Sequence, residues 1–172
     1  ALLLSHGKYL AKKREEFLLF INQFQKTFFP FFVKYDKSEI SEERLQQYKQ
    51  AEIGAGVTLV GPHRDDVLLL TQHASSSEAV ALKHFASRGQ QRLVTLELKL
   101  AQIAYMTKQI GKKPLLLLDD IFSELDSKNI QLVLSQITGH QMVMTTTHKE
   151  FISGVGIGTV EMIELNNETI QH

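Results

Sequence analysis

Apolar residues recur at steps of three and four along the first thirty positions, which is the spacing of one face of an amphipathic helix. We therefore predict a helix over residues 5–29, stopped or kinked by Pro30, which cannot donate a helical hydrogen bond. A second helix is predicted from Ser41, a suitable N-cap residue, to about Glu52. This phenylalanine-rich segment, residues 1–53, is more typical of a helical arm than of a catalytic core.

The pattern changes at Gly54, where β-branched residues and leucines cluster around a Gly-Pro turn. We predict strands at 57–60 and 67–72, joined by "GPHRDD", and a short extended segment at 80–85. The stretch "SRGQQR" then opens a helix of about 20 residues that ends at Gly111. Apolar residues lie on two sides of this helix, so we expect it to pack on two faces.

The last third of the chain alternates strands and helices. A fully buried strand is predicted at 115–118, a helix at 127–137 and a strand at 141–148. A short helix, a glycine-spaced loop and a final strand at 159–165 follow. This order predicts an α/β fold, with helices packed on a mostly parallel sheet.

Composition adds mainly exclusions. The 172 residues suffice for one domain, or for one domain with a helical appendage. Nineteen basic residues balance nineteen acidic ones, so binding to nucleic acid would need a local basic patch. The absence of cysteine excludes disulfides, thiolate zinc sites and cysteine nucleophiles. No apolar run approaches the roughly 20 residues of a membrane-spanning helix.

Polar residues follow the predicted buried strand directly. Ligands of open α/β sheets lie at the carboxyl ends of strands, where Asp119 and Asp120 follow four leucines. There a carboxylate can hold Mg²⁺, and a second can polarise an attacking water. Two adjacent carboxylates on a buried strand would also be costly without a cation or donors. The alternative is that one of them simply starts a turn or caps a helix.

Three further positions have both a chemical and a structural interpretation. Ser87, Arg88 and Gly89 precede a helix N-terminus that could bind an anion, although many helices begin with Ser-x-Gly. Asp126 is a suitable N-cap for the helix at 127–137. His148 follows a strand and could contact a phosphate, or it could be structural.

The order of these motifs is more specific than any one of them. "SRGQQR", a long helix, "PLLLLDD", "SELD" and "TTTH" resemble the signature motif, Walker B strand, D-loop and switch histidine of ABC/SMC-type ATPases. With "GVTLVGPHRDD" and "FASRGQQRLVTLELKLAQ", the chain resembles the C-terminal part of the RecF family of bacterial DNA replication and repair ATPases. One departure is Arg88, which stands where ABC transporters have glycine.

The resemblance implies a fold and a set of roles. Residues 1–53 would be the end of the helical arm domain, and 54–172 the C-terminal part of the ATPase head. Asp119 would hold Mg²⁺ through water, Asp120 would polarise the attacking water and His148 would sense the γ-phosphate. The remaining nucleotide-binding residues implied by the resemblance are Ser87, Arg88, Gly89 and Gln90, which would act on the opposite subunit, and Asp126 at the dimer interface.

The resemblance also implies cofactors and partners. ATP and Mg²⁺ would be sandwiched in a homodimer that binds gapped DNA and single-/double-strand junctions. The protein would act in the cytoplasm, without a membrane, in replication, recombination and the SOS response, together with recombination mediator proteins. Residues considered for contact with DNA phosphates are Lys12, Lys13, Arg14 and Arg64, and the alternative for each is an ordinary solvated surface.

A phosphate-binding loop, G-x-x-x-x-G-K-[ST], is absent from these 172 residues. Gly7-Lys8 and Gly111-Lys112 both lack the upstream glycine and the following Ser or Thr. We expect the loop to lie upstream of Ala1, and the chain alone to be inactive although a complete protein would be a weak DNA-dependent ATPase. Two alternatives remain, another SMC-like ATPase of the OLD or RecN type and a degenerate ATPase half that serves as an interaction module.

Overall fold

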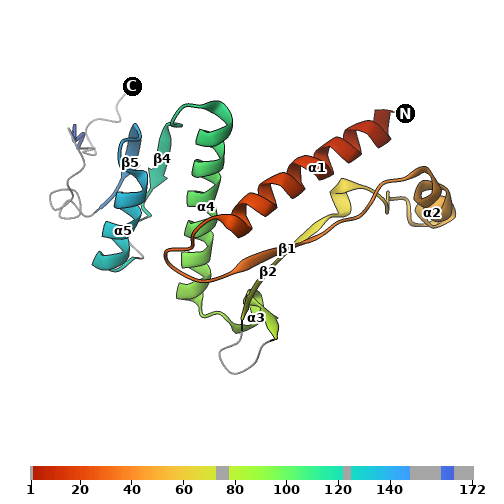
Figure 1. Ribbon diagram of the computed structural model, residues 1–172, viewed down its shortest axis with the longest axis horizontal. Coiled ribbons are helices and arrows are strands. Elements are labelled where there is room, and N and C mark those ends of the chain that lie inside the picture. The colour runs from red at the N-terminus through yellow and green to blue at the C-terminus, as the bar shows by residue number, and fades with distance from the viewer. Residues whose placement is uncertain (1, 73–77, 122–124, 148–159, 165–172) are drawn as a thin grey trace. The chain divides into compact units, whose positions relative to one another are not determined.

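The computed structural model describes residues 2–72, 78–121, 125–147 and 160–164 (Figure 1). The chain divides into two compact units, residues 1–109 and 110–172, and each is described by itself. None of the described helices is both long enough and apolar enough to cross a membrane.

The first helix, α1 (Leu2–Gln23), ends six residues before the predicted end at 29. The reason is a distant side chain. The carboxylate of Glu97 accepts hydrogen bonds from the backbone N–H groups of Thr27 (3.0 Å) and Phe28 (2.7 Å). Those N–H groups would otherwise continue the helix, so the chain turns before it reaches Pro30.

Three strands form an antiparallel sheet in the order β1 (Phe32–Asp36), β2 (Asp66–Gln72) and β3 (Ala79–Ala81). Strand β2 was predicted within one residue, whereas β1 was missed. In Figure 1, β1 and β2 run alongside each other over their full pairing, from Phe32 opposite Leu70 to Asp36 opposite Asp66. Strand β3 leads into the short helix α3 (Leu82–Phe85).

The predicted strand at 57–60 is wrong. These residues form a loop before the 3₁₀ turn η1 (Pro62–Arg64). The backbone carbonyl of Thr58 accepts the Arg64 Nε–H at 2.8 Å, and its hydroxyl contacts His63 Nε2 at 2.8 Å. These bonds hold residues 57–60 against "GPHRDD" as a loop, and the segment does not pair with a strand.

Helix α2 (Glu42–Ala55) confirms the second predicted helix. Ser41 is its N-cap, and the serine hydroxyl accepts the Arg44 N–H at 3.2 Å. Gly56 ends the helix with a left-handed φ of 66° and donates its N–H to the Glu52 carbonyl. Both ends therefore follow from local sequence.

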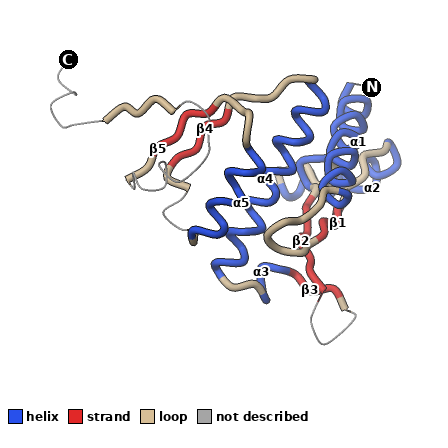
Figure 2. Tube along the Cα trace, turned by 60° about the vertical axis from the view of Figure 1, so that its left-hand side comes forward, coloured by secondary structure: helices blue, strands red, loops and turns tan. Residues whose placement is uncertain are grey.

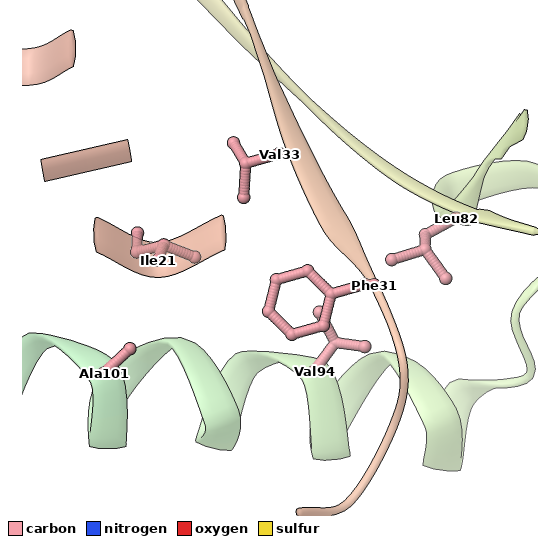
Figure 3. Close-up of a cluster of buried hydrophobic side chains, with 6 residues drawn as sticks. All are labelled: Ile21, Phe31, Val33, Leu82, Val94 and Ala101. Carbon is pink, nitrogen blue, oxygen red and sulfur yellow. The ribbon is translucent and has the colours of Figure 1, made fainter. Parts of the chain in front are cut away.

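The core of the first unit lies along α4 (Arg88–Ile110), the predicted long helix. Figure 3 shows Val94 and Ala101 on α4 facing Ile21 of α1 and the β1 segment. Tyr105 adds ring contacts with α1, 5.0 Å from Phe17 and 5.2 Å from Phe20 between ring centroids. The six buried residues of this cluster are Ile21, Phe31, Val33, Leu82, Val94 and Ala101.

The second unit contains two parallel strands, β4 (Leu116–Asp119) and β5 (Met142–Thr145), with helix α5 (Ser127–Ile137) between them in sequence. Figure 2 shows the two strands lying next to each other. Helix α5 buries one apolar face, formed by Ile130, Val133, Leu134 and Ile137.

Two predictions for this unit are corrected. The strand at 115–118 was expected to be fully buried, but Leu117 is 74% exposed, so one face of the strand is uncovered. The predicted strand at 159–165 is also wrong, because the described residues 160–164 are not in a strand. The helix and glycine-spaced loop expected before it lie outside the described residues.

Candidate functional site

The ends of β4 and β5 bring together Asp119, Asp120 and Thr145. Asp119 is the last residue of β4 and lies opposite Thr145 in the parallel register. The Thr145 hydroxyl donates to Asp119 Oδ1 at 2.5 Å. The Asp120 N–H donates to the Thr145 carbonyl at 3.2 Å and to its hydroxyl oxygen at 3.1 Å. The two candidate residues are therefore fixed to one position on the neighbouring strand.

Both aspartates are exposed to solvent. The expected cost of two buried carboxylates does not apply, because water can solvate each of them. Asp120 adopts a left-handed backbone conformation with φ 43°, the only positive φ among the described non-glycine residues. Backbone strain of this kind is typical of active-site turns.

The donor set at this edge fits a hard cation. Mg²⁺ prefers oxygen ligands and is commonly held by one or two carboxylates while it keeps several waters. Asp119 offers one carboxylate next to the Asp120 turn. Within the described part of the chain, no three His, Asp or Glu side chains gather into a metal cluster. Asp119 and Asp120 are the residues at this strand end whose carboxylate oxygens could hold such a cation.

Asp126 has the capping geometry that the sequence indicates. Its Oδ1 accepts the Asn129 backbone N–H at 2.8 Å, and its Oδ2 accepts Asn129 Nδ2 at 3.1 Å. Both oxygens thus serve the N-terminus of α5, which explains the residue without a ligand. The role at a dimer interface implied for Asp126 stays a prediction.

The residues before α4 form a reciprocal capping box. Ser87 Oγ accepts the Gln90 N–H at 3.2 Å, and Gln90 Oε1 accepts the Ser87 N–H at 2.9 Å. Arg88 and Gly89 lie between them and are exposed, as are both capping residues. A Cβ on Gly89 would come no closer than 4.0 Å to Ser87 Oγ, so the space around this glycine is open. These four residues lie in the first unit, whereas the aspartates lie in the second.

The "GPHRDD" segment is organised by Asp65, whose side chain is 3% exposed. Its carboxylate accepts bonds from Arg14 Nη1 (2.8 Å), the Ser38 N–H (2.8 Å) and the Tyr35 hydroxyl. Burial alone would raise the pKa of Asp65, but these three donors outweigh it and hold the pKa below its ordinary value. Burial, followed by the bond to Asp65, raises the pKa of Tyr35 to about 12. Asp65 therefore connects "GPHRDD" to α1 through Arg14, to β1 through Tyr35 and to the segment after β1 through Ser38.

Three of the four basic residues considered for DNA contact have bonds within the protein. Arg14 is engaged with Asp65 and the Pro62 carbonyl. Lys13 forms an ion pair with Glu16 at 2.6 Å. Arg64 bonds to the Thr58 carbonyl through Nε. The remaining candidate, Lys12, is exposed.

Sequence reasoning missed Thr145 and Asp65, and His148 lies outside the described residues. For Thr145 the available signal was positional, because residues that end neighbouring parallel strands meet at one edge. For Asp65 the available signal was its place in "GPHRDD", directly after a basic residue and a Gly-Pro turn.

Individual known proteins resemble the chain, although a family model does not. No model of a known protein family matches the chain. It is 40% identical over 139 residues to a DNA replication and repair protein RecF from Bacillus mycoides (strain KBAB4), which is 78% of this chain and 36% of the relative. It is 38% identical over 113 residues to RecF from Chloroherpeton thalassium, covering 63% of this chain and 29% of the relative.

Solved structures agree. The recombination mediator protein RecF with ATP, of the RecFOR pathway, matches 86% of this chain and 43% of its own, with a TM-score of 0.68 and 26% identity. The corresponding RecF-ATPrS structure gives a TM-score of 0.69 and 25% identity, over 86% of this chain and 44% of that one. The chain spans about a third of the length of the curated relatives and less than half of the solved chains it matches.

The fold is thus that of part of an ABC/SMC-type ATPase head together with a helical segment. Within this class the chain resembles RecF, and sequence and structure both place the likeness there.

Proposed function

We propose that this chain supplies part of the ATP site of a RecF-type protein that acts in DNA replication and repair. The observation that carries the proposal is the pair of aspartates at the end of β4, joined to Thr145 of β5. Its support is the similarity to RecF proteins and to a RecF structure solved with ATP.

Each residue has a proposed role. Asp119 holds Mg²⁺ through water, and Asp120 polarises the water that attacks the γ-phosphate. Asp126 caps α5 and contacts the second subunit. His148 senses the γ-phosphate. Bound Mg²⁺ supplies charge neutralisation at the phosphates.

The first turn of α4 is the proposed point of action across a dimer. Helix N-termini attract anions because their backbone N–H groups lack helical partners. The first turn of α4 is exposed, and the capping box engages the N–H groups of Ser87 and Gln90, so Arg88 and Gly89 are the residues of this turn whose N–H groups lie outside the capping box. We propose that this turn contacts the γ-phosphate of ATP held by a second subunit. The homodimer would then bind gapped DNA in the cytoplasm and work with recombination mediator proteins, with a role in the SOS response.

A charge placed at Ser87 tests this proposal without removing the cap. In a complete RecF-type protein that carries this sequence, Ser87→Asp keeps an N-cap acceptor but adds a negative charge facing the γ-phosphate. We expect ATP-driven dimerisation, measured by light scattering, to be lost while ATP binding by the monomer stays within about twofold.

The control is Ser41→Asp, the same exchange at the N-cap of α2. It should dimerise like the unaltered protein. If Ser87→Asp also dimerises normally with ATP, the first turn of α4 does not act across the interface. The 172-residue chain alone, which lacks the phosphate-binding loop, should show no ATP turnover.

A further inference from the structure

We propose that Thr145 is a positioning residue for both aspartates, an inference that rests on the proposed ATP site. One hydroxyl group makes two bonds, donating to Asp119 Oδ1 and accepting from the Asp120 N–H. The backbone carbonyl of Thr145 accepts the same N–H.

The bond to Asp119 orients its carboxylate. The distance of 2.5 Å is at the short end for a hydroxyl and a carboxylate, as expected for a charge-assisted bond. It uses one acceptor site of Oδ1 and does not involve Oδ2, so Oδ2 would be the less committed oxygen toward a metal-bound water. A carboxylate held in one orientation binds its ligand without first losing rotational freedom.

The bonds to Asp120 hold an unusual backbone. With φ 43°, Asp120 occupies a region that side chains other than Asn and Asp rarely adopt. Its N–H is shared between the Thr145 carbonyl at 3.2 Å and the hydroxyl at 3.1 Å. This shared bond stabilises the turn that carries the Asp120 side chain past the end of the strand.

A purely structural role makes a different prediction. Thr145 is exposed, so water could satisfy its hydroxyl, and valine has the same shape and an equal preference for strands. If only shape matters, Thr145→Val is neutral. If the hydroxyl positions the aspartates, valine disrupts them and serine, which keeps the hydroxyl, does not.

The test measures ATP turnover against Mg²⁺ concentration in a complete RecF-type protein that carries this sequence. We expect Thr145→Val to raise the Mg²⁺ concentration for half-maximal turnover by about tenfold and to lower kcat, because a charge-assisted bond is lost. Thr145→Ser should stay within about twofold.

The matched control is Thr138→Val, which removes a hydroxyl bond to the Leu134 carbonyl at the end of α5. Thr138 precedes β5, so it lies at the strand edge opposite to Asp119. It should leave the Mg²⁺ dependence unchanged. Thr145→Ala provides a second variant without the hydroxyl, should valine prevent folding.

A second readout needs no ATP. In the 172-residue chain, amide hydrogen exchange at Asp120 should be several-fold faster in Thr145→Val than in Thr145→Ser. Equal exchange and equal Mg²⁺ dependence in the two variants would overturn the inference. Turnover that is absent from the unaltered complete protein, with the exchange difference intact, would instead count against the proposed function.

Discussion

The buried carboxylate of Glu97 gives the sharpest stability prediction. Its side chain is 0% exposed, and it accepts hydrogen bonds from the backbone N–H groups of Thr27 and Phe28, 70 and 69 residues away in sequence. Lys26 adds an electrostatic interaction. These bonds end α1 and fix the segment that leads into β1. The replacement Glu97→Gln keeps the shape and one acceptor oxygen, but removes the charge.

The expected magnitude follows from the two donors. A hydrogen bond to a charged acceptor contributes about 2 kcal/mol, and one to a neutral acceptor about 1 kcal/mol. Two such bonds weakened by Glu97→Gln predict a loss of about 2 kcal/mol in the free energy of unfolding. In Glu97→Leu both N–H groups lose their partner, and we expect about 4 kcal/mol from the same bonds.

The chain offers a direct assay. It has no tryptophan, and all four tyrosines lie within the first unit, so tyrosine fluorescence during urea unfolding reports on that unit alone. The control is Glu15→Gln on the exposed side of α1, which should change stability by less than about 0.5 kcal/mol. If Glu97→Gln is equally neutral, or stabilising, then desolvation of the carboxylate cancels its hydrogen bonds and the account of the α1 end is refuted.

Two more predictions concern the caps and the Asp65 cluster. Asp126→Ala should remove the N-cap of α5, at a cost of about 1 kcal/mol in helix stability. Amide exchange in α5 should then be about fivefold faster. Unchanged exchange would show that the cap is not needed. The pKa of Tyr35 is raised to about 12, so the folded state favours the neutral phenol. The contribution of this phenol to the free energy of unfolding is complete below pH 10 and is lost as the pH rises through about 12. Unfolding free energies measured from pH 9 to 12 should fall less steeply in Tyr35→Phe, and identical slopes would contradict the assignment.

Local signals in the sequence located most helices and the candidate site. Ser41 marked the start of α2 and Asp126 the start of α5, because a cap acts within four residues, whereas α2 continues to Ala55, beyond the predicted end at about Glu52. Asp119 and Asp120 were found for a similar reason, since they directly follow an apolar run. The role of these two aspartates stays a prediction.

The remaining features depend on contacts far apart in sequence. The end of α1 is set by Glu97, which no local pattern around Gln23 reveals. Strand β1 was missed although Val33 and Tyr35 alternate with more exposed neighbours, because its pairing partner β2 begins 30 residues later. Thr145 could be joined to Asp119 only once the register of β4 and β5 was known.

The exposed face of β4 was also missed because burial depends on contacts far apart in sequence. A run of leucines predicts burial on both sides, but Leu117 is uncovered and so is Val143 on β5, at 58% exposed. The sequence carries the hydrophobic preference of the strand, whereas burial depends on which other elements are present.

Single-turnover ATP hydrolysis tests the central claim most directly, using a complete RecF-type protein that carries this sequence. Because a positioned general base contributes about 10²-fold or more, Asp120→Asn should slow hydrolysis by at least about 100-fold while ATP still binds. The control Asp36→Asn, an exposed aspartate at the end of β1, should hydrolyse ATP normally. Hydrolysis by Asp120→Asn at the rate of the unaltered protein would contradict the assignment of this strand end as the catalytic part of the site.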